Sequence, residues 1–288
     1  MERKNVTPAI SVVFVVLNEE DHLPLALSCA KDWASEIIVV DMYSDDSTAK
    51  VAQQFGAEVL YHKRSPICED ARDYAVQRAS GDWVLILDAD ELVPEPLSRK
   101  LLAAVSSGAA ESYEIPRNTY INGVPMRFMG WGPQQEKNIR LFKKGSVRLD
   151  RVIHYGICPQ PGARLMALSY EKDMAIQHFS YVDISQLYDK LNRYTSVEAQ
   201  QAYDRNETFS LLKAVLRSLR EFASRYFKSQ GFRDGWRGFQ LSVFYMIYRW
   251  TVYAKLQELY ATGGREKIIE KYRDTANAII AQYDRGSD

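Results

Sequence analysis

The first hundred residues alternate short apolar runs with longer stretches of helical periodicity. Apolar, β-branched runs at residues 10–17 (ISVVFVVL), 36–41, 57–61 and 83–88 each predict a strand, and the first has the continuous hydrophobicity of a strand buried on both faces. Residues 18–34, 46–55, 66–80 and 94–105 follow these runs and predict helices. Such alternation predicts an α/β fold whose mostly parallel, doubly wound sheet is flanked by helices.

The pattern changes twice further along the chain. Between residues 111 and 180, extended segments at 112–116, 137–142 and 167–176 alternate with Gly and Pro turns, and we expect this region to cover the open edge of a ligand site. From residue 183 the pattern is helical, with a break at 231–238. We therefore predict two domains, residues 1–182 and a helical extension at 183–288.

Charge separates the same two regions, although the 37 basic and 37 acidic residues balance overall. Residues 1–100 hold 18 acids against 10 bases, whereas residues 208–255 hold nine bases, two acids and twelve aromatics. Residues 209–227 predict an amphipathic helix with a basic side. A basic, aromatic segment favours an anionic partner. No nucleic-acid-binding module is recognisable, so we expect no nucleic acid and favour a membrane surface; a core helix packed on the first domain is the alternative.

The three cysteines, Cys29, Cys68 and Cys158, are odd in number and widely spaced, which disfavours a disulfide framework or a zinc ribbon. The N-terminus lacks a signal-peptide pattern, and no apolar run approaches the ~20 residues of a transmembrane helix. We expect a cytoplasmic protein that lies peripherally on the inner face of the cytoplasmic membrane.

Polar residues follow three of the predicted strands. Asn18 and Asp41 end the first two, and Leu87-Asp88-Ala89-Asp90-Glu91 ends the fourth. Ligands of parallel sheets bind beyond these carboxyl ends. Two carboxylates at this spacing suit Mg²⁺ or Mn²⁺ held beside a diphosphate, and the alternative is an acidic turn that caps the next helix.

Residues 10–97 resemble glycosyltransferase family 2, which has the Rossmann-like GT-A fold. The matching pieces are residues 10–20 (ISVVFVVLNEE), 33–48 (WASEIIVVDMYSDDST), 56–57 and 81–94 (GDWVLILDADELVP). Looser matches at residues 139–142, 151–154, 231–235 and 255–256 extend the likeness over most of the chain, and this fuller pattern is similar to bacterial lipopolysaccharide-core β-glucosyltransferases. The resemblance implies that residues 1–182 form the nucleotide-sugar-binding and catalytic domain and that 183–288 face the acceptor and the membrane.

The resemblance also implies residue roles. Asp41 would accept a hydrogen bond from the base, as a carboxylate can from uracil N3–H. Arg72 would lie near the phosphates, although Asp73 replaces the Asn common beside it. Asp90 would bind the metal together with Asp88. The full set implied to contact a nucleotide sugar, a UDP-hexose by preference, is Leu17, Asn18, Glu20, Asp41, Ser44, Arg72, Asp88, Ala89 and Asp90. As alternatives, Asn18 and Ser44 cap helices, Glu20 is a first-turn acid, and Arg72 is an exposed helix residue.

The catalytic base is the point at which the sequence departs from the resembling enzymes. Inverting transferases need a carboxylate to take the acceptor proton. Where those enzymes read His-Glu, this chain reads His154-Tyr155. Glu136, in a Gly- and Pro-flanked loop, is our preferred candidate ahead of Asp150 and Asp173; a solvated loop acid is the alternative.

His154 is a candidate third metal ligand or acceptor contact, and His178 is a weaker one. Trp131 and Tyr120 either stack on an acceptor sugar or pack in the core.

The function that these features predict is an inverting transfer of a hexose from a UDP-sugar to a lipid-linked saccharide in the cell envelope, with Mg²⁺ or Mn²⁺ as cofactor. Two other classes remain open. A sugar nucleotidyltransferase also pairs an α/β sheet with metal-binding acids, but no glycine-rich basic phosphate loop follows the first strand. A non-catalytic membrane adaptor with a retained nucleotide fold would explain the absence of a glutamate after His154.

Overall fold

The main sheet of this computed structural model joins seven strands in the order β12-β6-β9-β4-β1-β2-β3, and residues 9–65, 68–136, 138–149 and 156–284 are described. The parallel part is β1 (Ile10–Val16), β2 (Glu36–Asp41), β3 (Glu58–Tyr61) and β4 (Trp83–Leu87). Next to β4, the antiparallel β9 (Ile139–Lys143) pairs with β6 (Ser112–Glu114), which is parallel to β12 (Leu165–Ala167). The predicted mostly parallel α/β sheet of the GT-A type is confirmed.

Alternating side chains of β1 explain why helices cover both faces of the sheet. Val12 and Phe14 pack in one core with α1 (Leu23–Ala30), α2 (Thr48–Gln54) and α4 (Glu95–Ser107). Val13 points into a second core with α3 (Glu69–Arg78). Successive strand residues point to opposite faces, so a continuous apolar run requires cover on both.

A second sheet lies beside the first and takes the order β5-β13-β7-β8. Its strands are β5 (Glu91–Leu92), β13 (Ile176–Tyr181), β7 (Arg117–Ile121) and β8 (Val124–Pro125). Only residues 88–90 separate β4 of the main sheet from β5 of the second. The acidic turn at Asp88 and Asp90 is therefore the junction of the two sheets. A two-stranded pair, β10 (Val147–Leu149) and β11 (Ile157–Pro159), completes the strands described.

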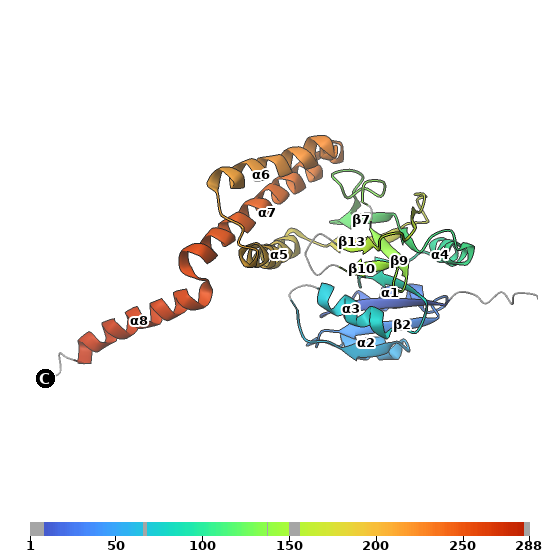
Figure 1. Ribbon diagram of the computed structural model, residues 1–288, viewed down its shortest axis with the longest axis horizontal. Coiled ribbons are helices and arrows are strands. Elements are labelled where there is room, and N and C mark those ends of the chain that lie inside the picture. The colour runs from blue at the N-terminus through green and yellow to red at the C-terminus, as the bar shows by residue number, and fades with distance from the viewer. Residues whose placement is uncertain (1–8, 66–67, 137, 150–155, 285–288) are drawn as a thin grey trace, which may run out of the picture.

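The C-terminal helices pack on the second sheet. Leu187 and Leu191 of α5 (Ile184–Asp204) share a core with Leu241 and Phe244 of α7 (Gly235–Thr262) and with Ile121 of β7. Figure 1 shows α6 (Leu211–Ala223) lying along α7, while α8 (Arg265–Asp284) projects away from the body. In the described part of the chain, no helix combines the length and hydrophobicity needed to cross a bilayer.

Several predicted boundaries were wrong for local reasons. The first helix begins at Leu23, not at residue 18, because Asn18 has a positive φ of 58° and starts a loop. The strand predicted at residues 167–176 is a connection between β12 and β13. The predicted break at 231–238 is shorter, since a 3₁₀ turn at Gly231–Asp234 leads directly into α7.

Gly238 supplies a test of how α7 is seated. A Cβ at this position would lie 1.8 Å from the carbonyl oxygen of Gly231. We expect Gly238→Ala to lower the free energy of unfolding by about 1–3 kcal/mol, as overpacking does. In an uncrowded helix the same change would raise the free energy of unfolding by about 1 kcal/mol. The sign of the change, measured by urea denaturation, therefore distinguishes a crowded position from an uncrowded one. Arg237→Ala, an exposed neighbour, is the control and should change little.

Candidate active site

A cavity of about 810 Å³ opens where the carboxyl ends of β1 and β4 meet the second sheet and the helices α5 and α7. One wall carries Leu17 and Glu19 after β1 and Arg72 of α3. The floor is the junction between β4 and β5. The opposite wall comes from β7, β13, α5 and α7; its polar and aromatic members include Arg117, His178, Ser180, Tyr181, Lys190, Arg193, Tyr194, Tyr245 and Tyr248.

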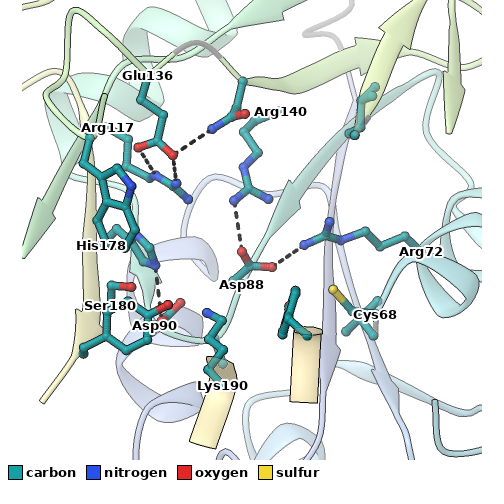
Figure 2. Close-up of a pocket in the computed structure, with 18 of the residues that line it drawn as sticks. Cys68, Arg72, Asp88, Asp90, Arg117, Glu136, Arg140, His178, Ser180 and Lys190 are labelled. Atoms are coloured by element: carbon teal, nitrogen blue, oxygen red, sulfur yellow. Dashed lines mark hydrogen bonds and ion pairs between the residues drawn. The ribbon is translucent and has the colours of Figure 1, made fainter. Parts of the chain in front are cut away.

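Asp88 lies on the floor between two arginines (Figure 2). Its Oδ1 accepts a hydrogen bond of 2.7 Å from Arg72, and its Oδ2 accepts one of 3.0 Å from Arg140. Burial alone would raise the pKa of Asp88, but Arg140 and Arg72 hold that pKa well below its usual value. Asp88 is therefore a fixed negative charge, and both of its oxygens are already engaged.

Glu91 lies behind Asp88 with no exposed surface. Its Oε1 accepts hydrogen bonds from Arg117 at 2.5 Å and Arg140 at 2.6 Å. Its Oε2 accepts the backbone N–H of Asp88 at 3.0 Å. One buried carboxylate thus sets the β4–β5 turn and holds two strands of different sheets, β7 and β9, by their arginines.

Glu136 continues this series of charges on the far side of Arg117. Both carboxylate oxygens of Glu136 accept hydrogen bonds from Arg117, and Asn138 Nδ2 donates to Oε1 at 3.2 Å. Burial lowers the pKa of Arg117, but Glu91 and Glu136 outweigh it and raise that pKa above its usual value. Glu136 lines the cavity, as a candidate base must.

Asp90 is the carboxylate of the junction that does not meet an arginine in the described residues. Its Oδ2 lies 3.3 Å from Nε2 of His178, whose Nδ1 lies 3.3 Å from Oγ1 of Thr119. The backbone pairing of β13 with β5 brings the two side chains together, since Phe179 N–H donates to Asp90 O at 2.9 Å. Figure 2 shows both side chains at the same edge of the cavity.

Four of the residues predicted to bind the nucleotide join two loops instead of lining the cavity. Asp41 is 1% exposed, and its Oδ1 accepts from both N–H and Oγ of Ser44. Ser44 Oγ in turn accepts the N–H of Asn18 at 2.9 Å. Glu20 accepts the N–H of Ser47 at 2.8 Å. Neither Asn18 nor Ser44 caps a helix, because α1 and α2 follow His22 and Ser47.

The cavity does gather Leu17, Arg72, Asp88, Ala89, Asp90 and Glu136 of the predicted site residues. Arg72 is an ion-pair partner of Asp88 and not an exposed helix residue. Glu19, the neighbour of Glu20, lines the cavity, and burial raises the pKa of its carboxyl against the opposing effect of His22. Asp150 and His154 lie outside the described residues.

Glu91 and Arg117 were not identified as site residues from the sequence, and His178 ranked as a weaker candidate than His154. Glu91 follows the two aspartates directly, so its position was a usable signal. Arg117 and His178 are 26 and 59 residues from their partners Glu91 and Thr119, and only the strand pairing brings them together.

Trp131 and the tyrosines form the aromatic part of the wall. The ring of Trp131 stacks on Tyr181 at 5.8 Å and meets the edge of Tyr245 at 5.9 Å. Burial raises the pKa of Tyr181 to about 12, and Asp90 adds to the effect, so the phenol stays neutral. Tyr120, the other predicted stacking residue, packs against Phe179 instead.

The fold and the carboxylate junction define a GT-A protein, and comparison with known proteins gives its family. The sequence matches the model described as Glycosyl transferase family 2 over residues 11–169, more than half of the 288 residues. The chain therefore belongs to glycosyl transferase family 2 and is a glycosyltransferase.

Relatives extend the likeness over most of the chain. An uncharacterized glycosyltransferase of Rickettsia typhi is 26% identical over 261 residues, 87% of each chain. A lipopolysaccharide core biosynthesis glycosyltransferase of Rhizobium meliloti is 24% identical over 271 residues, 90% of this chain and 96% of that one. Among solved structures, glucosyl-3-phosphoglycerate synthase of Mycobacterium tuberculosis matches with 25% identity and a TM-score of 0.34, over 39% of this chain and less than half (44%) of its own.

The junction predicts a strong dependence of stability on Glu91. We expect Glu91→Ala to lower the free energy of unfolding by about 3–5 kcal/mol, because two buried guanidinium groups lose their shared counter-charge. Urea denaturation measures the loss. Glu95→Ala is the control, since the exposed pair of Glu95 with Arg99 contributes at most about 1 kcal/mol. Equal losses in the two variants would contradict the role given to Glu91.

Proposed function

We propose that this glycosyltransferase transfers a hexose from a UDP-sugar to a lipid-linked saccharide of the cell envelope, with inversion at the anomeric carbon. The observation that carries the proposal is the junction itself, where Asp90 with His178 and Asp88 with two arginines face one cavity. The relative named for lipopolysaccharide core biosynthesis supports the class of acceptor. Family membership favours glycosyl transfer over a nucleotidyltransferase or an adaptor.

The donor would bind against the wall formed by α3 and by the residues that follow β1 and β2. Leu17 and Met42 offer apolar surface there for a base, and Arg72 supplies positive charge toward the phosphates. Asp41 and Ser44 sit directly behind this wall, hydrogen-bonded to each other at 2.6 Å. The uracil contact proposed for Asp41 requires that Ser44 share or release this carboxylate. Ala89 would complete the pocket, while Asn18 and Glu20 would hold together the two loops behind it.

A divalent cation fits the donor set at the junction. The Asp90 carboxylate and Nε2 of His178 converge at 3.3 Å, and Mg²⁺ or Mn²⁺ beside a diphosphate takes one or two protein ligands while phosphate oxygens and water supply the others. No cluster of three such side chains occurs in the described ranges. Asp90 and His178 would hold the ion, with Asp88 near it and His154 as a further candidate. When bound, it would neutralise charge on the departing diphosphate.

Glu136 is the proposed base. The acceptor hydroxyl would attack the anomeric carbon, the bond from that carbon to the diphosphate oxygen would break, and the hydroxyl proton would pass to Glu136. Glu136 accepts two hydrogen bonds from Arg117 and one each from Asn138 and Thr119, which together use the roughly four lone-pair directions of a carboxylate. The bond from Thr119 is the longest at 3.4 Å, and the acceptor hydroxyl would displace it while Arg117 orients the carboxylate. Asp88, fixed by its two arginines, would position the sugar from the floor.

The proposal that the protein binds a membrane surface rests on helix α6. This helix turns its small residues Ala214 and Ser218 toward the protein and leaves an apolar face outside. That face, the α6 leucine face, consists of Leu211, Leu212, Val215, Leu216 and Leu219. Lys213, Arg217 and Arg220 are exposed on the same helix. Apolar surface flanked by bases suits an anionic lipid surface, and we propose that it lies on the inner face of the cytoplasmic membrane.

Calorimetric titration of UDP, GDP and ADP with and without Mn²⁺ tests the donor site. We expect UDP to bind best, with Mn²⁺ strengthening binding, and Asp90→Ala to weaken UDP binding in Mn²⁺ by at least about tenfold, or 1.4 kcal/mol. Asp82→Ala, an exposed acid at the other end of β4, is the matched control. Preference for GDP or ADP would overturn the UDP assignment, and equal binding by both variants would remove Asp90 from the metal site.

Vesicle flotation tests the α6 leucine face. We expect the protein to float with vesicles that contain phosphatidylglycerol and to bind less well in high salt, which screens the bases. Leu212→Gln with Leu216→Gln should lower the bound fraction several-fold, because both side chains are more than half exposed and apolar.

Leu25→Gln is the control, since Leu25 is 53% exposed but lies on α1, outside the C-terminal helices. Folded wild-type protein that fails to float would sink the membrane proposal. A loss as large in the Leu25 variant would show that exposed leucines bind vesicles without regard to place.

A further inference from the structure

Most charged side chains around the cavity are paired, and the exceptions among the residues that the structure describes are Glu114, Lys190 and Arg193. Arg72, Arg140 and Arg117 meet the carboxylates of Asp88, Glu91 and Glu136 in turn. Arg225 pairs with Glu221 at 2.8 Å. Lys190 and Arg193 also line the cavity, yet neither has a carboxylate within 4.0 Å among the residues that the structure describes. Two positive charges therefore face the cavity without an ion-pair partner among the described residues.

Helix α5 places these two cations together. Residues three apart on a helix share a face, so Lys190 and Arg193 point the same way. Lys190 Nζ lies 5.0 Å from the ring of Tyr181 and 5.9 Å from that of Tyr194. The guanidinium of Arg193 lies 5.5 Å from the ring of Tyr194. These contacts orient the cations but leave their charge available. Figure 2 shows Lys190 entering the cavity on the side of Asp90.

The same part of the wall carries the aromatic surface. Tyr181, which Lys190 contacts, is stacked on Trp131. Aromatic faces accept the C–H face of a sugar ring, and adjacent unpaired cations attract an anion. The proposed donor wall, with Leu17, Met42 and Arg72, comes from β1, β2 and α3 and not from α5. The base of the donor would therefore lie away from α5, whereas the diphosphate proposed at Asp90 would lie on the side of Lys190 (Figure 2), so an anion bound by α5 belongs either to the acceptor or to that diphosphate.

We propose that the acceptor saccharide carries an anionic group, a phosphate or a carboxylate, that Lys190 and Arg193 bind beside the Trp131–Tyr181 aromatic surface. The proposal rests on the glycosyl-transfer function proposed above and narrows its acceptor to an acidic saccharide. The diphosphate of the donor is the other source of the same chemistry, and the experiment separates the two.

Ligand-observed NMR provides the acceptor readout with three probes: glucose 6-phosphate, glucuronic acid and glucose. Each is measured with and without saturating UDP and Mn²⁺. We expect the two acidic sugars to bind at least about tenfold more tightly than glucose. The double variant Lys190→Gln, Arg193→Gln should abolish that difference, whereas Lys190→Arg and Arg193→Lys, which keep the charge, should retain it.

UDP affinity is measured in parallel on the same variants. It should stay within about twofold of wild type in the double variant. Arg205→Gln, which removes an exposed base just beyond α5, is the matched control and should change neither measurement. Thermal denaturation checks that each variant is folded.

Each outcome of these measurements either supports or overturns the proposed anion subsite. A tenfold loss of UDP affinity in the double variant would assign the two cations to the donor diphosphate and overturn the proposal. Equal binding of glucose and the acidic sugars, or an unchanged preference in the double variant, would overturn it as well. If wild type binds no UDP but still prefers acidic sugars through Lys190 and Arg193, the donor assignment fails while the anion subsite stands.

Discussion

The buried carboxylate of Glu91 is the constraint on which the rest of the site depends. A carboxylate without solvent is unfavourable unless opposite charges and hydrogen-bond donors surround it. Arg117 of β7 and Arg140 of β9 meet that requirement from two different sheets, and the N–H of Asp88 completes it. The two sheets can pack side by side only in the register that brings these groups together. The position of the β4–β5 turn, and with it the direction of Asp88 and Asp90, follows from that register.

Alternating charges extend this constraint across the cavity. From Arg72 through Asp88, Arg140, Glu91 and Arg117 to Glu136, each charged group has an opposite neighbour. This series of ion pairs includes Asp88 but not Asp90, so the two carboxylates of the β4–β5 turn have different partners. Asp88 is held by arginines on both oxygens, whereas the Asp90 carboxylate lies beside His178. The two aspartates are two residues apart in sequence, yet their charged surroundings differ.

Much of the main sheet could be predicted from sequence because its signals are local. Continuous apolar runs identify β1, β2 and β4, and the aspartates after β4 lie at the edge of the sheet where the cavity opens. What could not be predicted depends on pairing between distant segments. Nothing near Arg117 indicates that it lies between Glu91 and Glu136, and nothing near His178 indicates Asp90. Likewise, the sequence shows Asn18 and Ser44 only as two polar loop residues. The hydrogen bond between them, across 26 residues, forms because the two loops pack together.

The C-terminal helices show how one segment supports two kinds of surface. The sequence indicates that α6 is amphipathic, but an amphipathic helix normally turns its apolar side inward. Here the inward side consists of Ala214 and Ser218, and such small residues let α6 lie close along α7 and leave the leucines outside. On its other side α7 delivers Phe244, Tyr245 and Tyr248 to the cavity wall. One helix pair therefore carries both the surface proposed to meet lipid, on α6, and part of the wall proposed to meet the acceptor, on α7.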